Sequence, residues 1–195
     1  AVTGHMRPDG DCIGSQLAVA YALKNSGKKV TVFNQDEMPK KLAFLDPKRT
    51  LSRPKKPVPY DSVVVTDCAN YERMGSVCNA ISIRKTLINI DHHGSNSRYG
   101  DINWIDPNSA SSGELVFRLI KQANWTITPA IADCLFTAIS TDTGSFQYAT
   151  TRPSTYQTAA ELVRRGANVA RICKEVYQSY PLSRVKLQKH LYNSF

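Results

Sequence analysis

The stretch of sequence that decides the fold is Gly4-His5-Met6-Arg7-Pro8-Asp9-Gly10-Asp11, which places one imidazole and two carboxylates within seven residues. Pro8 and Gly10 favour a tight turn. Residues 1–3, before the turn, are typical of the end of a β-strand, and residues 13–25, after it, carry apolar side chains at helical spacing. We therefore predict a strand-to-helix loop at the carboxyl end of a strand, where open α/β sheets bind their ligands.

This loop allows two interpretations. Three polar groups crowded together repel one another and lose hydration unless a cation neutralises them, which favours a metal site. The alternative is a solvated acidic turn that caps the following helix. The stretch alone leaves both interpretations open.

The rest of the chain alternates between strand and helix patterns. Apolar runs predict strands at 30–34, 62–67 and 86–90, whereas residues 51–60 are expected to form a loop. Helices are predicted at 40–45, 71–80, 111–124, 129–139, 153–166, 169–178 and 181–193. This order predicts an α/β fold with a doubly wound, mainly parallel sheet, helices on both faces and a helical C-terminal connector.

Further acidic and histidine side chains follow the later strands. Asp67 ends one apolar run, Asp91-His92-His93 ends the next, and Asp142 lies in a small-residue turn expected after the helix at 129–139. Because parallel strands all end on one side of a sheet, these groups are expected to converge with those of the first loop. Histidine and aspartate ligands without a thiolate suit Mn²⁺ or, less selectively, Mg²⁺, Co²⁺ or Zn²⁺. Six or more ligands exceed one site, so we expect two metal ions.

The composition limits the class of protein. The 195 residues carry a net charge of +9 with 42% hydrophobic content, which suits a globular protein and favours anionic partners, although scattered solvated lysines and arginines are the alternative. There is no apolar run of about 18 residues, so no membrane association is expected. Five cysteines form no CxxC pair, and we interpret them as reduced thiols of a cytoplasmic protein.

Ser111-Ser112-Gly113-Glu114 opens a predicted helix. Ser111 with Glu114 three residues later fits a capping box. The functional alternative is that free backbone amides at this helix start bind a phosphate.

The ordered set of motifs resembles the DHH superfamily of phosphoesterases. The residues that carry the resemblance are His-x-x-x-Asp-x-Asp from His5, the strand-end Asp67, the triplet Asp91-His92-His93 and the late Asp142. The first motif, with Gly10 between its aspartates, is most similar to the nanoRNase/pAp-phosphatase (bifunctional oligoribonuclease) branch. Family II inorganic pyrophosphatases usually carry Thr in place of Gly10, and RecJ-type exonucleases lack the initial His.

The resemblance implies a role for each motif residue. His5 and Asp9 would bind a first metal ion, Asp11, His92 and Asp142 a second, and Asp67 would bridge both. Asp91 and His93 would be the catalytic pair: His93 would face the phosphate and Asp91 would orient its neighbours. Arg7, Arg152 and the residues Ser111, Ser112 and Gly113 are candidates for substrate binding.

The implied function is a metal-dependent phosphoesterase with two Mn²⁺ ions, with Mg²⁺ or Co²⁺ as alternatives. It would hydrolyse short RNA, or 3′-phosphoadenosine-5′-phosphate (pAp), with water activated by the metals. Alternatives are a hydrolase of pyrophosphate or polyphosphate, a cyclic dinucleotide phosphodiesterase, and a non-catalytic nucleotide-binding module. A homodimer is also considered. The resemblance implies a catalytic domain at residues 1–178 and a helical linker at 179–195 leading to a C-terminal DHHA1 domain that this chain lacks.

Overall fold

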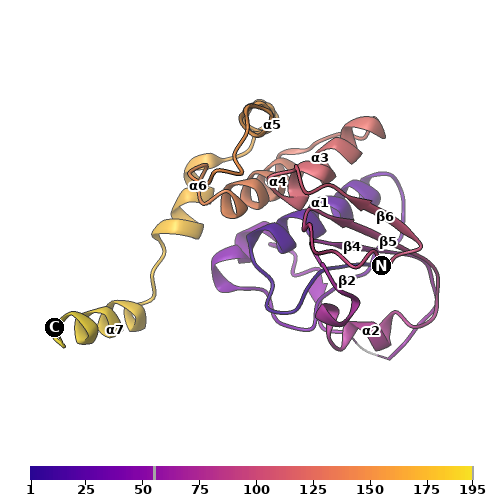
Figure 1. The fold of residues 1–195 in the computed structure, drawn as a ribbon, viewed down its shortest axis with the longest axis horizontal. Coiled ribbons are helices and arrows are strands. Elements are labelled where there is room, and N and C mark those ends of the chain that lie inside the picture. The colour runs from indigo at the N-terminus through magenta and orange to yellow at the C-terminus, as the bar shows by residue number, and fades with distance from the viewer. Residues whose placement is uncertain (55, 195) are drawn as a thin grey trace.

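A computed structural model describes residues 1–54 and 56–194, and within them six strands form one parallel sheet (Figure 1). The strands are β1 (Val2–Thr3), β2 (Val32–Phe33), β3 (Leu51–Ser52), β4 (Tyr60–Thr66), β5 (Arg84–Asp91) and β6 (Ile102–Ile105). Their order across the sheet is β3-β2-β1-β4-β5-β6, and each neighbouring pair is parallel. After β1, the chain adds β2 and β3 on one side of that strand. It then returns to add β4, β5 and β6 on the other side of β1. The β1–β4 boundary is therefore the point where the strand order reverses and where such sheets form a binding crevice.

Helices cover both faces of the sheet. The helices of the described residues are α1 (Gly10–Asn25), η1 (Lys40–Leu45), η2 (Tyr71–Met74), α2 (Val77–Ala80), α3 (Ser112–Gln122), α4 (Pro129–Asp142), α5 (Pro153–Arg164), α6 (Val169–Cys173), η3 (Lys174–Gln178) and α7 (Leu182–Tyr192). The larger core lies between one face of the sheet and α1, α3 and α4, whereas a smaller core lies beneath η2 and α2 on the other face (Figure 1). Side chains of β4 and β5 supply the two cores alternately: Val63, Val65 and Leu87 belong to the smaller core, while Ile90 belongs to the larger.

The predicted fold class is confirmed, but three local predictions were wrong. β6 was missed because its Ile-Asn-Trp-Ile run is short, lies at the edge of the sheet and is partly exposed. Part of the loop expected at 51–60 pairs as β3, and β4 begins at Tyr60; Lys55 of that loop lies outside the described residues. The helix at 129–139 continues to Asp142, which is therefore the last residue of α4 rather than part of a following turn.

The C-terminal segment differs from the rest of the chain. α7 extends away from the sheet and none of its residues is buried (Figure 1). Phe195 lies outside the described residues. Over residues 1–54 and 56–194, we find no helix with both the length and the apolar character needed to cross a bilayer.

Gly10 lets the first loop approach the end of α4. A Cβ atom at this position would lie 2.7 Å from the Cβ atom of Thr141 and closer still to the other atoms of that side chain. We expect Gly10→Ala to destabilise the chain by about 1–3 kcal/mol, because overpacking forces backbone shifts. Gly94→Ala is the control, since its Cβ would make only ordinary contacts with Pro107. Urea unfolding of both variants measures the difference, and equal stability would contradict the close contact.

Candidate metal centre

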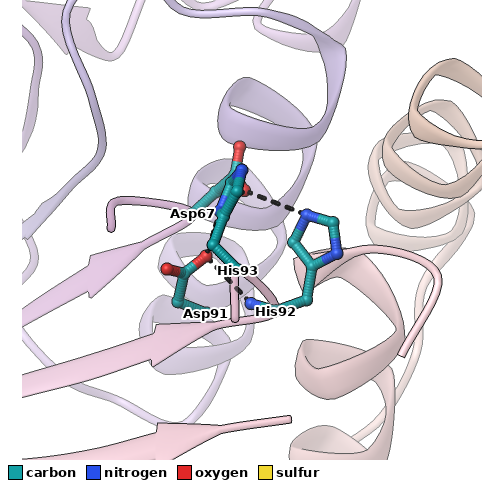
Figure 2. A group of neighbouring side chains, drawn as sticks. All are labelled: Asp67, Asp91, His92 and His93. Atoms are coloured by element: carbon teal, nitrogen blue, oxygen red, sulfur yellow. Dashed lines mark hydrogen bonds and ion pairs between the residues drawn. The ribbon is translucent and has the colours of Figure 1, made fainter. Parts of the chain in front are cut away.

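The loops after β1, β4 and β5 and the end of α4 bring the predicted ligands together. The predicted ligands are His5, Asp9, Asp11, Asp67, His92 and Asp142, and the predicted catalytic pair is Asp91 and His93. Three overlapping groups of side chains have ligand atoms within 4.8 Å of one another, and together they contain all of these residues except Asp9, with Cys12 in addition. Figure 2 shows Asp67 beside the Asp91-His92-His93 triplet at the carboxyl edge of the sheet. The convergence follows from the topology, because β1, β4 and β5 are adjacent and parallel.

Backbone carbonyls fix the orientation of the two histidines. His5 Nδ1 lies 2.8 Å from the Met6 carbonyl oxygen, and His92 Nδ1 lies 3.3 Å from that of Ser109. A carbonyl only accepts hydrogen bonds, so each Nδ1 must carry the proton that it donates. In both neutral rings, the lone pair of Nε2 is therefore available to a metal ion.

His5 presents its Nε2 atom to two carboxylates. The distances are 3.4 Å to Asp67 Oδ2 and 3.8 Å to Asp9 Oδ2. The other oxygen of Asp9 accepts a hydrogen bond of 3.0 Å from the Cys12 amide at the start of α1. Asp9 therefore caps the helix, as one sequence interpretation expected, and still directs an oxygen towards His5.

His92 presents its Nε2 atom to three carboxylates. The distances are 3.3 Å to Asp142 Oδ2, 3.7 Å to Asp67 Oδ1 and 3.8 Å to Asp11 Oδ2. This nitrogen is buried, and no atom of residues 1–54 and 56–194 forms a hydrogen bond with it. Two atoms about 2.1 Å from one ion, at an angle of about 90–110°, are about 3.0–3.4 Å apart. The distance from His92 to Asp142 lies in this range, and the other two distances are a few tenths of an ångström longer.

Asp67 lies between the two histidines. Its Oδ2 faces His5 and its Oδ1 faces His92, and the Ser112 hydroxyl donates a 3.1 Å hydrogen bond to Oδ1. The backbone of Asp67 is in the left-handed region, with φ of 56°, which is uncommon for a residue other than glycine and tolerable for aspartate. This conformation turns one carboxylate towards two separate groups of ligands.

The electrostatics also favour a cation. Burial, together with the charges of Asp67 and Asp142, raises the pKa of Asp11 well above its ordinary value. Burial, with further contributions from Asp67 and Asp9, raises the pKa of Asp142 to about 6. Burial lowers the pKa of His5, but the carboxylates of Asp67 and Asp9 outweigh it and raise that pKa overall. In the protein alone, protons must therefore supply the positive charge that a metal ion would bring.

His93 is held differently from His5 and His92. Its Nδ1 donates a 2.7 Å hydrogen bond to Asp91 Oδ1, and this bond, more than any other contribution, raises the pKa of His93. Asp91 is fully buried and also accepts hydrogen bonds from the His92 amide and, at 2.6 Å, from Asn96 Nδ2. The side chain of His93 is 36% exposed. Asp91 thus orients a partly exposed imidazole at the edge of the metal ligands.

The expectation of a free phosphate-binding helix start at 111–113 needs correction. The Ser111 hydroxyl does cap α3 by accepting from the Glu114 amide at 3.3 Å. The amides of Ser112 and Gly113, however, donate to the carboxylate of Asp11 at 2.6 and 2.9 Å. The helix start therefore binds a carboxylate of the chain itself, and its partial positive charge stabilises the ionised form of the predicted ligand Asp11.

The two candidate arginines occupy different surroundings. Arg7 is exposed, with φ of 53°, and its backbone amide donates to Asp36. The Arg152 guanidinium donates a 3.3 Å hydrogen bond to Asn108 and lines a hollow of about 270 Å³ that also includes Ser109. Because the Ser109 carbonyl also accepts from His92, this hollow adjoins the predicted ligand His92.

Sequence reasoning missed three side chains of the site: Cys12, Asn96 and Ser112, the last of which it considered only for its amide. Asn96, three residues after His93, binds Asp91, and the Ser112 hydroxyl binds Asp67. Cys12 lies one residue after Asp11 and is fully buried. Only the position of Asn96, three residues after the triplet, could have indicated its role in advance.

Known proteins share the sequence and the fold. The bifunctional oligoribonuclease and PAP phosphatase NrnA of Thermus thermophilus is 36% identical to this chain. The match covers 88% of this chain and 51% of that protein. The protein of the same name from Bacillus subtilis is 27% identical over 97% of this chain and 60% of its own length. The chain thus spans between half and two thirds of these curated relatives.

Solved structures agree with the architecture. An exopolyphosphatase-related protein from Bacteroides fragilis matches 98% of this chain and 60% of its own, with a TM-score of 0.88 and 26% identity. A putative family II inorganic pyrophosphatase from Methanococcus jannaschii matches 89% of this chain and 60% of its own, with a TM-score of 0.67 and 21% identity, and shares the fold. The model of the DHH family, N-terminal domain, matches residues 1–139, which include every predicted metal ligand except Asp142. The chain belongs to the DHH family.

Proposed function

We propose that this chain is the catalytic domain of a two-metal phosphoesterase that hydrolyses short RNA, pAp or both. The observation that carries the proposal is that the two oxygens of Asp67 face two different histidines, each with further carboxylates around its Nε2 atom. One ion would be held by His5, Asp9 and Asp67, and the other by Asp11, Asp67, His92 and Asp142. We propose Mn²⁺ for both ions, because imidazole and carboxylate ligands suit it, with Mg²⁺ or Co²⁺ as alternatives.

The side chains would divide the work at the phosphate. When bound, two divalent cations supply an activated water nucleophile and stabilise the charge that develops on the phosphoryl oxygens. His93, fixed by Asp91, would direct its free Nε2 towards the phosphate and donate a proton or hydrogen bond to it. Arg152, beside the hollow that adjoins His92, would bind a second anionic group of the substrate. Arg7 remains a weaker candidate for the same task, and residues 111–113 would act only through Asp11 and Asp67.

The named relatives support the substrate class. The Thermus thermophilus and Bacillus subtilis proteins are named for oligoribonuclease and PAP phosphatase activities. A second candidate function, hydrolysis of polyphosphate, is favoured by the Bacteroides fragilis protein, which is described as exopolyphosphatase-related. No observation specifically favours the cyclic dinucleotide alternative.

Product analysis tests the function. This chain, loaded with Mn²⁺ and present in excess over substrate, should release mononucleotides from a two- to five-nucleotide RNA or phosphate from pAp. Pyrophosphate and polyphosphate serve as the competing substrates in parallel reactions. Faster turnover of polyphosphate than of both nucleotide substrates would favour the second candidate, and no product from any of them would contradict a phosphoesterase.

Metal binding should depend on pH through Asp142. Because its pKa is raised to about 6 in the metal-free protein, a bound proton competes with Mn²⁺ below that pH. The apparent Mn²⁺ affinity should therefore fall as pH decreases, by about tenfold per unit for each proton displaced. The stability of the metal-free protein should change in the opposite direction. The Asp142 carboxyl stabilises the folded state increasingly as pH falls from about 6 towards the pKa that this group has in the unfolded chain. Calorimetric titrations between pH 5 and 8, repeated with Asp142→Asn, measure the effect, and an equally steep pH dependence in the variant would contradict it.

Three further proposals concern the whole protein. We propose residues 1–178 as the catalytic domain and 179–195 as a helical linker, which is supported by the complete exposure of α7. Cytoplasmic localisation and a homodimer stay predictions, to be tested by cell fractionation and by analytical ultracentrifugation.

A further inference from the structure

Cys12 lies among the ligands of the first metal site. Its Sγ atom, His5 and Asp67 have ligand atoms within 4.8 Å of one another, and all three residues are at least 96% buried. The proposed function uses His5 and Asp67 together with Asp9 and leaves the thiol unused. Asp9 is much the most accessible member of the site, since its side chain is 61% exposed.

The surroundings hold the thiol at this place. A Cβ atom on Gly4 would lie 2.3 Å from Sγ, so the end of β1 closes off the space behind the sulfur. The thiol makes a weak contact, 3.9 Å, with the carbonyl oxygen of His5 and also interacts with the His5 side chain. The sulfur is thus packed against His5, inside the site.

The chemistry of the two possible ligand sets differs. His5, Asp9 and Asp67 offer one nitrogen and carboxylate oxygens, which suit Mn²⁺. His5, Cys12 and Asp67 offer nitrogen, sulfur and oxygen, and a sulfur ligand selects Zn²⁺ and other thiophilic ions. An ion bound by the second set would lie deeper, away from the exposed Asp9.

We propose that the first metal site is a dual site, in which a thiophilic divalent cation such as Zn²⁺ or Cd²⁺ is bound by His5, Cys12 and Asp67 in place of Mn²⁺ bound by His5, Asp9 and Asp67. The thiol proton is released to solvent as the sulfur–metal bond forms. Since His5 and Asp67 take part in both sets, the two kinds of ion exclude each other. This inference rests on the proposed two-metal function. It implies that thiophilic metal ions inhibit the proposed activity by displacing Mn²⁺ from the first site.

Cadmium titration of the metal-free chain tests the inference, with sulfur-to-cadmium charge-transfer absorption as the readout. We expect one sulfur-bound Cd²⁺ per chain and loss of the band when excess Mn²⁺ is added. Cys12→Ser should abolish the band and weaken Cd²⁺ binding by more than about tenfold. Removal of a residue that only supports a metal ligand already lowers metal affinity by about tenfold or more. Cys134→Ser is the matched control, because Cys134 is also fully buried but lies in the interior of α4.

The outcomes separate this inference from the proposed function. A band that survives in Cys12→Ser, a band that excess Mn²⁺ leaves unchanged, or Cd²⁺ binding without a band would each overturn the dual site. Mn²⁺ titration of the same samples tests the two-metal proposal, and Cys12→Ser should still bind two Mn²⁺ ions. If Cys12→Ser does not fold, ¹¹³Cd NMR of the unaltered chain decides, since a sulfur ligand moves the resonance far downfield and oxygen or nitrogen ligands alone do not.

Discussion

Asp67→Asn should weaken the binding of both metal ions and lower turnover sharply. The carboxylate offers one oxygen to the His5 group and the other to the His92 group, so a neutral amide weakens both sets of ligands at once. Asparagine is chosen because it tolerates the left-handed backbone conformation of Asp67 and matches the size of the side chain. Loss of a ligand shared by two ions should lower turnover by about a thousandfold or more. A thousandfold loss corresponds to a rise of about 4 kcal/mol in the activation barrier.

Asp142→Asn is the matched control for this variant. Asp142 faces His92, at 3.3 Å, and belongs to the second group of ligands only. It should weaken one Mn²⁺ ion and leave the other near its original affinity. Calorimetric Mn²⁺ titrations of the two variants measure this, and two ions bound with unchanged affinity by Asp67→Asn would show that Asp67 is not a bridge.

His93→Ala should have the second largest effect, and it should act on turnover alone. His93 Nδ1 is engaged by Asp91, which leaves its partly exposed Nε2 to face a substrate rather than the buried ligands. Loss of a positioned proton donor typically costs about 10²–10⁴-fold in rate. Metal affinity should change little, because Asp91 keeps its hydrogen bonds from Asn96 and the His92 amide.

Two further variants control for this prediction. His93→Asn keeps an N–H group near Asp91 but removes the distal nitrogen, so it should be as slow as His93→Ala. His190→Ala removes an exposed histidine of α7 and should leave the rate unchanged. If His93→Ala bound fewer metal ions than the unaltered chain, His93 would be a ligand and not a group that faces the phosphate.

The sequence predicts the position of a site residue correctly where the order of the strands alone decides that position. Once β1, β4 and β5 are recognised as parallel neighbours, the residues after each strand must meet at one edge of the sheet. That rule is enough to bring His5, Asp67 and His92 together, and the structure confirms it. The fold class followed from the same alternation of strands and helices.

Local rules failed at the start of α3, where a distant residue intervenes, and at the end of α4. A helix start with Ser-Ser-Gly looks free to bind a phosphate, but Asp11, which is 101 residues away from Ser112, accepts its amide hydrogen bond. The end of α4 was placed too early because its last residues are small and polar. The hydroxyl of Thr141 bonds back to the carbonyl of Thr137 and so supports the final turn that carries Asp142. The contact of Asp11 with Ser112 cannot be inferred from the residues beside either of them.

The number of Mn²⁺ ions bound per chain tests the central claim most directly. Equilibrium dialysis of the unaltered protein against saturating Mn²⁺ at neutral pH, followed by elemental analysis, gives this number. Two ions per chain are predicted, one at each of the histidines that face Asp67. One ion or none at saturation would contradict the two-metal centre.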